Sequence, residues 1–330
     1  MISHIIDCEK CISEGQPLPD VQAIKGERWF SLDTNIEQDM ISYWGGDWGC
    51  SSEYTRLRSV LLHRPGKEIE NFDFENVRFR EPVDPGKFQA QHDELANYYR
   101  VHGVEVYYTE KGRDDRPNSV FCRDKLFMTP EGAIVTRLAM AERRGEERFI
   151  SEALGRIGVP IVKTISGSGL FEGANAMWVD RYTCILSLSV RANREGYEQM
   201  EYELRRQGVK EIIPMQIPYG HAHIDGLLNL ASPDVAIVHA SQVPYVVVDA
   251  LKKKGYNIIE ATSQSEVKYR YAINFVAIEP NHVVTSIGAP RTVELLEKAG
   301  VKVDVLDLSE LNKGRGSVHC MTAFLKRDAQ

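Results

Sequence analysis

A pattern of a helix, a glycine and a strand recurs five times along the chain and constrains its fold more than any other feature. The five glycines, which stand 55, 50, 47 and 45 residues apart, are Gly103, Gly158, Gly208, Gly255 and Gly300. A valine or a tyrosine follows each glycine and opens a strand-like run. Because glycine adopts without steric cost the left-handed conformation that ends many helices, each glycine is predicted to follow a helix. A repeat of this length indicates a ring or an array of similar units.

The residues before each glycine support a helix. In the second copy, Phe149, Ile150, Ala153, Leu154 and Ile157 recur at the spacing of one helical face. The other helices are predicted around 88–99 and over 197–207, 244–254 and 290–299, and a proline at the first helical position suits the last two. Four helices also follow a turn between two apolar runs, at 129–132, 179–181, 232–234 and 279–281.

The predicted unit is therefore strand, turn, strand, helix, strand. The first copy has a strand from Leu57 to His63 but lacks the hairpin partner of that strand. An unassigned apolar run, Met321 to Leu325, lies at the far end of the chain. We expect this run to complete the first unit, which would close a ring of five ββαβ units in an α/β fold.

Composition limits the class of partner. The net charge is -7, the pI is about 5.8, and the Lys and Arg residues are scattered among acids, which argues against nucleic-acid binding. No apolar run approaches the ~20 residues of a membrane helix, and no leader pattern is present, so a cytoplasmic protein is expected. The six cysteines are too sparse for a disulfide framework. Cys8 and Cys11 form a CxxC without a second pair, so a structural zinc site is the less favoured interpretation.

Polar residues recur at one phase of the repeat, at the start of the first strand of each unit. They are Arg123 with Asp124, Glu172, His223 with Asp225, Asn274, and His319 with Cys320. Equivalent positions of a ring converge on its axis, and polar groups in a buried sheet are costly unless they face one another in a pocket. Each residue alone would more commonly be a satisfied polar group, and Cys320 alone a buried cysteine. Together they predict a catalytic site.

The residue types in this site indicate its chemistry. Several carboxylates in one pocket repel one another unless a cation joins them, and we expect the empty site to hold uncompensated negative charge. A planar guanidinium fits best, because its N–H groups pair with carboxylates. A bound cation would lower the pKa of a nearby thiol, which could then attack the central carbon, while a histidine transfers protons. Neither a metal nor an organic cofactor is expected.

Four ordered segments resemble the signature motifs of the guanidino-group modifying enzymes, namely arginine deiminases, dimethylargininases and amidinotransferases. These segments are 118–124, 171–175, 223–225 and 316–320, and the stretch 60–66 is similar to an early strand and turn of arginine deiminases. The resemblance runs from about Glu53 to the C-terminus. It implies the fold of this family, the five-bladed α/β propeller or pentein, which agrees with the repeat count.

The resemblance also implies roles for individual residues. Cys320 would be the nucleophile and His223 the general acid/base, while Glu172 would hold a guanidinium nitrogen or orient the histidine. Asp124 and Asp225 would grip the guanidinium. The chain departs from the family pattern at two other positions. Asn175 stands where an acid is common, and Arg315 replaces a glycine near the cysteine.

Further residues are assigned to substrate binding or held as alternatives. Arg191 is similar to the family position that binds the α-carboxylate of the substrate, and Asn175 and Asn274 are expected to line the same pocket. His221 competes with His223 for the proton-transfer role. His319 would point to the opposite face of a regular strand from Cys320, which favours a structural or substrate-lining role.

We predict one propeller domain over 53–330 and an N-terminal extension or flap over 1–52. The aromatic residues and glycines of 43–49 suit a mobile flap, a subunit contact in a homo-oligomer, or ordinary packing on the surface.

The predicted function is hydrolysis of a C–N bond in a guanidino compound, arginine or a methylated arginine, through a covalent thiouronium on Cys320 that yields a ureido product. One alternative is an amidinotransferase, which would pass the amidino group to an amine. Another is a propeller that binds a ligand without catalysis.

Overall fold

The computed structural model describes residues 13–15 and 34–330, and its contacts divide the chain into the units Met1–Asp39 and Met40–Gln330. In the first unit, α2 spans Ile36–Asp39. The second unit holds every element of the predicted ring. Cys8 and Cys11, for which a zinc site was weighed, lie outside the described residues.

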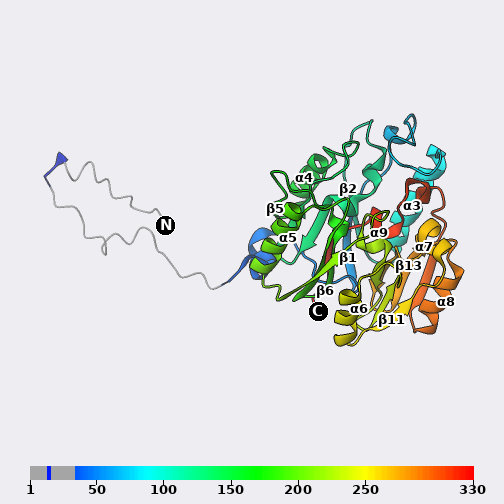
Figure 1. The fold of residues 1–330 in the computed structure, drawn as a ribbon. Coiled ribbons are helices and arrows are strands. Elements are labelled where there is room, and N and C mark those ends of the chain that lie inside the picture. The colour runs from blue at the N-terminus through cyan, green and yellow to red at the C-terminus, as the bar shows by residue number, and fades with distance from the viewer. Residues whose placement is uncertain (1–12, 16–33) are drawn as a thin grey trace. The chain divides into compact units, whose positions relative to one another are not determined.

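The second unit is a five-unit α/β propeller made of five three-stranded sheets that follow one another around the molecule (Figure 1). The first sheet contains β15 (Ala323–Arg327), β1 (Leu57–Leu62) and β2 (Glu105–Tyr108). The second and third contain β3 (Leu126–Thr129), β4 (Gly132–Val135), β5 (Ile161–Thr164), β6 (Ala176–Asp180), β7 (Thr183–Leu188) and β8 (Glu211–Gln216). The fourth and fifth contain β9 (Leu228–Leu230), β10 (Val235–Val238), β11 (Asn257–Glu260), β12 (Val276–Glu279), β13 (His282–Ser286) and β14 (Lys302–Leu306).

Each sheet has the predicted order. The first two strands are antiparallel, and the third strand, which follows the helix, is parallel to the second. In the first sheet β15 pairs with β1 in antiparallel register, with Leu61 opposite Ala323 and Val60 opposite Phe324. The C-terminal strand therefore supplies the missing hairpin partner and closes the ring, as predicted.

Burial falls from the inside of each sheet to the outside. All residues of β9 and β10 are buried, whereas both ends of the outer strand β11 are exposed. Strands buried on both faces need continuous apolar runs, which the inner strands have, and the outer strands carry polar residues toward water. The first strand of each unit thus starts at the axis, which places the turn before it there as well.

The five predicted helices are present. They are α3 (Pro85–Val101), α4 (Glu146–Ile157), α5 (Arg194–Arg206), α6 (Tyr245–Lys253) and α8 (Pro290–Lys298). All five repeat glycines have φ between 76° and 91°, the left-handed conformation predicted for them. Pro290 is the first residue of α8 as expected, but Pro244 is the N-cap of α6, one residue before the predicted position.

A sixth helix, α7 (Gln264–Arg270), was not predicted. Ser263 caps it by accepting a hydrogen bond from the backbone N–H of Glu266 at 3.3 Å, so the signal was a capping box in the sequence. The Glu266 carboxylate in turn accepts hydrogen bonds from the backbone N–H groups of Arg291 and Thr292 in the first turn of α8. The extra helix therefore holds the start of α8 in place.

The segment around Cys320 differs from the prediction of a strand from Met321 to Leu325. It forms a short helix, α9 (Val318–Met321), and β15 begins only at Ala323. The side-chain oxygen of Asn274 accepts the N–H groups of His319 and Cys320, which fixes this turn in a way that an apolar run cannot reveal. The other polar sets likewise lie at short 3₁₀ turns that precede a strand: η4 (Cys122–Lys125), η5 (Gly173–Asn175) and η6 (Ile224–Gly226).

Within the second unit, the stretch before the first strand is hydrogen-bonded to the propeller. The Gly49 N–H donates to the Leu325 carbonyl at 2.9 Å, and the Cys50 N–H donates to the Thr129 carbonyl at 3.3 Å. The Trp44 indole N–H donates to the Gly158 carbonyl at 2.6 Å. A flap role for residues up to 52 stays a prediction.

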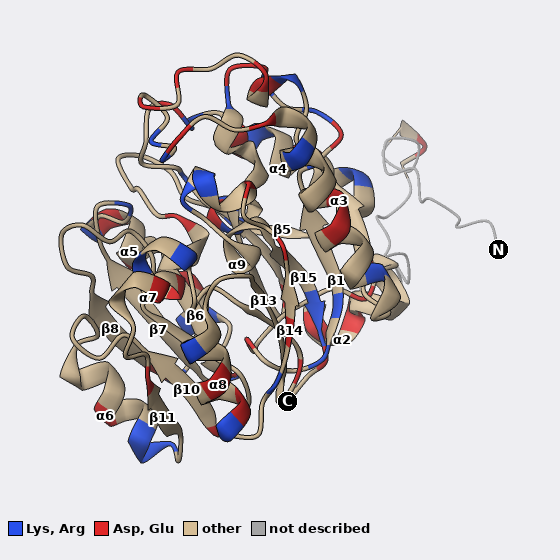
Figure 2. Ribbon diagram, turned by 90° about the vertical axis from the view of Figure 1, so that its right-hand side faces the viewer, with Lys and Arg blue, Asp and Glu red and all other residues tan. Residues whose placement is uncertain are grey.

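Lys and Arg are interspersed with Asp and Glu along the helices and loops on the side shown in Figure 2. Among the described residues, no helix combines the length and apolarity needed to cross a membrane.

Gly155, within α4, and Gly158, which directly follows it, provide a test of the helix end. A Cβ at Gly155 or Gly158 would meet open space, but only Gly158 has a positive φ, 80°. Gly155→Ala should raise the free energy of unfolding by roughly 0.5–1 kcal/mol, because alanine is the better helix former. Gly158→Ala should lower it by about 1–2 kcal/mol, because alanine is strained in the left-handed region. Urea unfolding of both variants checks this, and equal effects would contradict the assigned helix end.

Candidate active site

The polar residues predicted to meet at the axis are carried by short turns that contact one another. The turn η4 contacts η5 and α9, and η5 contacts η6. Asp124 lies in η4, Glu172 precedes η5, His223 precedes η6, and Asp225 lies in η6. A 3₁₀ turn directs successive side chains differently from a strand, so one turn can supply both a residue for the pocket and a residue for its support.

Cys320 is buried and held by Asn274. The Asn274 side-chain amide donates to the Cys320 sulfur at 3.2 Å and to the backbone carbonyl of Asp225 at 3.4 Å. The Cys320 thiol lies 3.6 Å from Asp225 Oδ2. Asn274, predicted to bind substrate, therefore contacts the Cys320 thiol and the backbone N–H groups of His319 and Cys320.

The groups around this thiol keep it protonated. Burial raises the pKa of Cys320 well above its ordinary value, and the nearby Asp225 and Asp124 carboxylates raise it further. The hydrogen bonds from Asn274 and the Ser317 backbone act in the opposite direction and are weaker. The thiol needs an added positive charge before it can become a thiolate.

A chain of buried charged groups supports Asp225. His319 Nδ1 is 2.8 Å from Asp225 Oδ2, and His319 Nε2 is 3.1 Å from Glu53 Oε2. Arg123 donates to the other oxygen of Glu53 at 2.9 Å. Burial raises the pKa of Asp225. The hydrogen bond from His319 and the charge of that ring have the larger combined effect and lower the pKa to about 2. These contacts fit the structural role expected for His319. Its direction is set by the short helix α9, however, and not by the alternation of side chains along a strand.

His223 is bound to Glu172. Its Nε2 lies 2.7 Å from Glu172 Oε2, and its Nδ1 lies 3.6 Å from Asp124 Oδ1. Burial lowers the pKa of His223, but Asp124 and Glu172 together outweigh it and raise the pKa above the ordinary value. Burial likewise raises the pKa of Glu172, and the His223 hydrogen bond and charge bring it down to about 2. The arrangement favours a protonated imidazolium between two carboxylates.

Arg143, which the sequence analysis missed, occupies one oxygen of Asp124. It is buried and pairs with Asp124 Oδ2 and with Glu146, at 3.0 Å from Glu146 Oε2. It also donates to the backbone carbonyls of Asn118 and Phe121. Its neighbours Glu142, Arg144 and Gly145 give the segment the composition of a solvated loop, so no sequence signal marks it.

Glu53, also missed, is a second buried charged partner. It is only 2% exposed and joins Arg123 to His319. Arg143 and His319 correct the expectation of uncompensated negative charge, because Asp124 pairs with the Arg143 guanidinium and Asp225 pairs with the His319 ring. Despite burial, the pKa of that ring is raised above its ordinary value, mainly by Asp225 and Glu53.

In the residues assigned to substrate binding, three buried polar atoms have no hydrogen-bond partner among the described residues. They are Asp124 Oδ1, Asn175 Oδ1 and Arg191 Nε. The Asn175 amide donates to the hydroxyls of Ser187 and Ser189, and Arg191 Nη1 lies 3.8 Å from Glu172 Oε1. Buried polar groups are rarely left unpaired, so two acceptors and one donor remain for a ligand.

Other predicted positions fall outside these contacts. His221 faces His239, with ring centroids 6.3 Å apart, and its pKa is lowered by burial and by His239. Arg315 is exposed and has φ of 65°, a conformation that glycine adopts freely, so its replacement of the family glycine costs backbone strain.

The same pocket could hold a metal ion in place of an organic cation. One ligand atom each from Asp124, Glu172 and His223 lies within 4.8 Å of the others. However, His223 Nε2 is already bonded to Glu172, and Arg143 and Arg191 bring positive charge beside both carboxylates. A guanidinium, which needs only hydrogen-bond acceptors, fits these contacts better than a metal that must displace them.

Comparison with known proteins gives a consistent result. Residues 75–327 match the model of the family described as N,N dimethylarginine dimethylhydrolase, eukaryotic. The N(G),N(G)-dimethylarginine dimethylaminohydrolase of Pseudomonas aeruginosa is 29% identical over 72% of this chain and 89% of its own length. The arginine deiminase of Limosilactobacillus reuteri is 20% identical over 84% of this chain and 97% of its own length.

A solved structure has a similar fold. The DDAH of Pseudomonas aeruginosa, a cysteine-to-serine mutant complexed with citrulline, aligns with a TM-score of 0.68, 23% identity, and coverage of 82% of this chain and 99% of that chain. This likeness supports the five-unit propeller.

The buried chain of charges predicts how Asp225→Asn should behave. The variant leaves His319 without its carboxylate and should lose roughly 3 kcal/mol of unfolding free energy at neutral pH. Because the pKa of Asp225 is lowered to about 2, its stabilisation is fully present above its ordinary pKa of 3.8 and is lost as the pH falls toward 2. The stability of the variant should therefore depend less on pH between about 4 and 2, although Glu172 still titrates there.

Urea unfolding at several pH values measures this. The control is Asp249→Asn, which alters only the surface contacts of Asp249 with Lys253 and Tyr245. An Asp225→Asn variant as stable as the control would show that the charged chain does not support the fold.

Proposed function

This chain belongs to the N,N dimethylarginine dimethylhydrolase family, and from that premise we propose that it hydrolyses a C–N bond of a guanidino compound through a covalent intermediate on Cys320. The observation that carries the proposal is a set of buried atoms without a hydrogen-bond partner, Asp124 Oδ1, Asn175 Oδ1 and Arg191 Nε, together with the buried Cys320 thiol, whose pKa the Asp124 charge helps to raise. The unpaired acceptors suit the N–H groups of a guanidinium, and the unpaired donor suits a carboxylate. An amino acid with a guanidino side chain, arginine or a methylated arginine, offers both.

In the first step the guanidinium binds between Asp124 and Asp225. Both carboxylates already have a partner on one oxygen, Arg143 for Asp124 and His319 for Asp225. The substrate is therefore not needed to hold the pocket together, and its charge adds to a site that is already organised. Arg191 would receive the α-carboxylate of the substrate.

In the second step the bound cation allows Cys320 to ionise. The same Asp225 and Asp124 charges that raise the pKa of the thiol are offset when a guanidinium lies between them and the sulfur. The pKa then falls, and the proton leaves to solvent. The thiolate forms in the complex, next to the carbon that it attacks.

In the third step the sulfur bonds to the central carbon of the guanidinium. His223, kept protonated by Asp124 and Glu172, donates its proton to the departing amine as the C–N bond breaks. The thiouronium remains on Cys320. The neutral His223 then takes a proton from water and the hydroxide adds to the carbon. The C–S bond breaks as the hydroxyl proton passes to the departing sulfur, which gives a neutral ureido product and restores the Cys320 thiol.

The citrulline in the solved relative supports this product class, because citrulline is a ureido amino acid. An amidinotransferase would differ only in the last step, where an amine takes the place of water. Mass spectrometry of products from arginine, methylarginines, agmatine and guanidino acids, with and without added amines, separates the two reactions. A ureido product without any amine is expected, and turnover that requires an amine would contradict the hydrolase assignment.

The nucleophile is tested by Cys320→Ser. The two side chains are nearly isosteric, so the variant should fold and melt like the parent. Turnover should fall by at least about 10³-fold, because a serine hydroxyl is not ionised by the bound cation. Steady-state kinetics check this with Cys122→Ser as the control, since Cys122 is also buried but lies outside the proposed chemistry. Turnover by Cys320→Ser within roughly tenfold of the parent would assign the nucleophile elsewhere.

The acid/base is tested by His223→Ala, with His221→Ala as its matched control two residues away. Loss of His223 should slow turnover about 10²–10⁴-fold and slow breakdown of the thiouronium, which intact-protein mass spectrometry would detect as an added mass on Cys320. His221→Ala should retain turnover. The reverse pattern would transfer the role to His221.

A further inference from the structure

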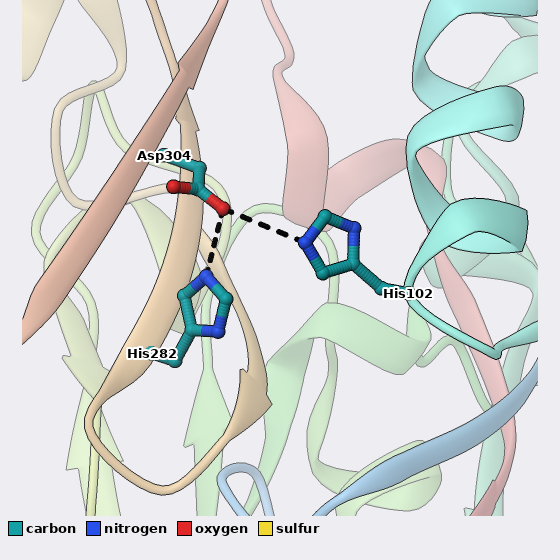
Figure 3. Close-up of side chains that lie close together, drawn as sticks. All are labelled: His102, His282 and Asp304. Atoms are coloured by element: carbon teal, nitrogen blue, oxygen red, sulfur yellow. Dashed lines mark hydrogen bonds and ion pairs between the residues drawn. The ribbon is translucent and has the colours of Figure 1, made fainter.

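A second cluster of ligand-type side chains lies outside the active site, where the first and fifth units meet. It consists of His102 at the end of α3, His282 in β13 and Asp304 in β14. One ligand atom of each residue lies within 4.8 Å of the others. Figure 3 shows both imidazole rings directed at the same oxygen of Asp304.

The hydrogen bonds of His102 fix which nitrogen faces the cluster. His102 Nδ1 is 2.8 Å from the Tyr98 backbone carbonyl, which can only accept, so Nδ1 carries the hydrogen. In the neutral ring Nε2 then holds a lone pair, and it faces Asp304 Oδ2 at 3.7 Å. A divalent cation placed between these two atoms would be attracted to both. A backbone carbonyl bonded to the second nitrogen is also the usual support of a metal-binding histidine.

The remaining contacts are compatible with a metal. His282 Nε2 is 2.7 Å from Asp304 Oδ2, and His282 Nδ1 faces Glu279 Oε1 at 3.8 Å. Ligand atoms around a tetrahedral zinc ion at its usual bond lengths are about 3.3 Å apart, so the present separations of 2.7 and 3.7 Å need only small side-chain rotations. Tyr98 Oη, 2.7 Å from Asp304 Oδ2, and Lys302 Nζ, 3.8 Å from Asp304 Oδ1, orient the carboxylate.

The cluster is open to a fourth ligand. A surface cavity of about 390 Å³ is lined by His102 and His282 together with Arg56, Glu279 and Lys302. Arg56 is paired with Glu279 at 3.5 Å, which reduces its repulsion of a cation. Water from this cavity could complete a four-coordinate ion.

We propose that His102, His282 and Asp304 bind a divalent transition metal ion, of which zinc is the best match. Two imidazoles and one carboxylate suit borderline ions, whereas magnesium and calcium prefer oxygen ligands. The ion would join the end of α3 in the first unit to the hairpin and outer strand of the fifth unit. Its role is structural, at the closure of the ring, and it is separate from the hydrolysis.

The test uses the full chain carrying Cys8→Ser, Cys11→Ser and Cys320→Ser, so that neither the CxxC pair nor the proposed nucleophile can bind the probe; the three remaining cysteines are buried. After removal of metals by a chelator, Zn²⁺ is titrated calorimetrically and thermal melts are recorded with and without Zn²⁺. One ion should bind per chain, and it should raise the melting temperature by several degrees, because it binds only the folded state.

His282→Gln and His102→Gln, added singly to this background, should each weaken Zn²⁺ binding at least about tenfold and remove the rise in melting temperature. His239→Gln, which changes a histidine near His221, should bind like the background. If His282→Gln does not fold, His102→Gln decides, because that side chain is partly exposed. Failure of the background to bind Zn²⁺, or equal affinity in all variants, would overturn the proposal.

Discussion

The whole site depends on the burial of carboxylates where the five units meet. A carboxylate cannot remain ionised in such a place without a partner, so each carboxylate at the axis is tied to a group from another part of the chain. Arg143 pairs with Asp124, His319 with Asp225, and His223 with Glu172. Arg143 and Asp124 belong to the same unit, but the two histidine pairs each join different units. Closing the ring therefore also brings together the His319–Asp225 and His223–Glu172 pairs.

This pairing also decides which groups are left for chemistry. It leaves Asp124 Oδ1 without a hydrogen bond, at 3.6 Å from His223 Nδ1, and it holds His223 in its protonated form. It leaves Cys320 without a cation, so burial and the two aspartates keep its thiol neutral. A site with this balance is inert until a positively charged ligand enters, which protects the nucleophile from adventitious reaction.

The ring and most of the residues at its axis could be predicted from the sequence, because both follow from a repeated pattern. Local sequence rules are enough to predict the left-handed glycines and the polar residues that recur at equivalent positions of the units. The strand β15 was predicted because the first unit lacked one strand. Arg143 and Glu53 could not be found in this way, since each lies in a charged or polar stretch typical of a surface loop and outside the recurring polar positions. The α9 turn was missed because the amide of Asn274, 45 residues away from His319, fixes it.

The ionisation of Cys320 with and without a bound cation tests the central claim most directly. The thiolate absorbance of the chain, corrected by that of the Cys320→Ser variant, is followed against pH in the absence and presence of an unreactive guanidinium-bearing analogue of arginine. We predict no thiolate at neutral pH in the free protein and a clear shift of the ionisation to lower pH in the complex. A thiolate already present at neutral pH without ligand would contradict the account.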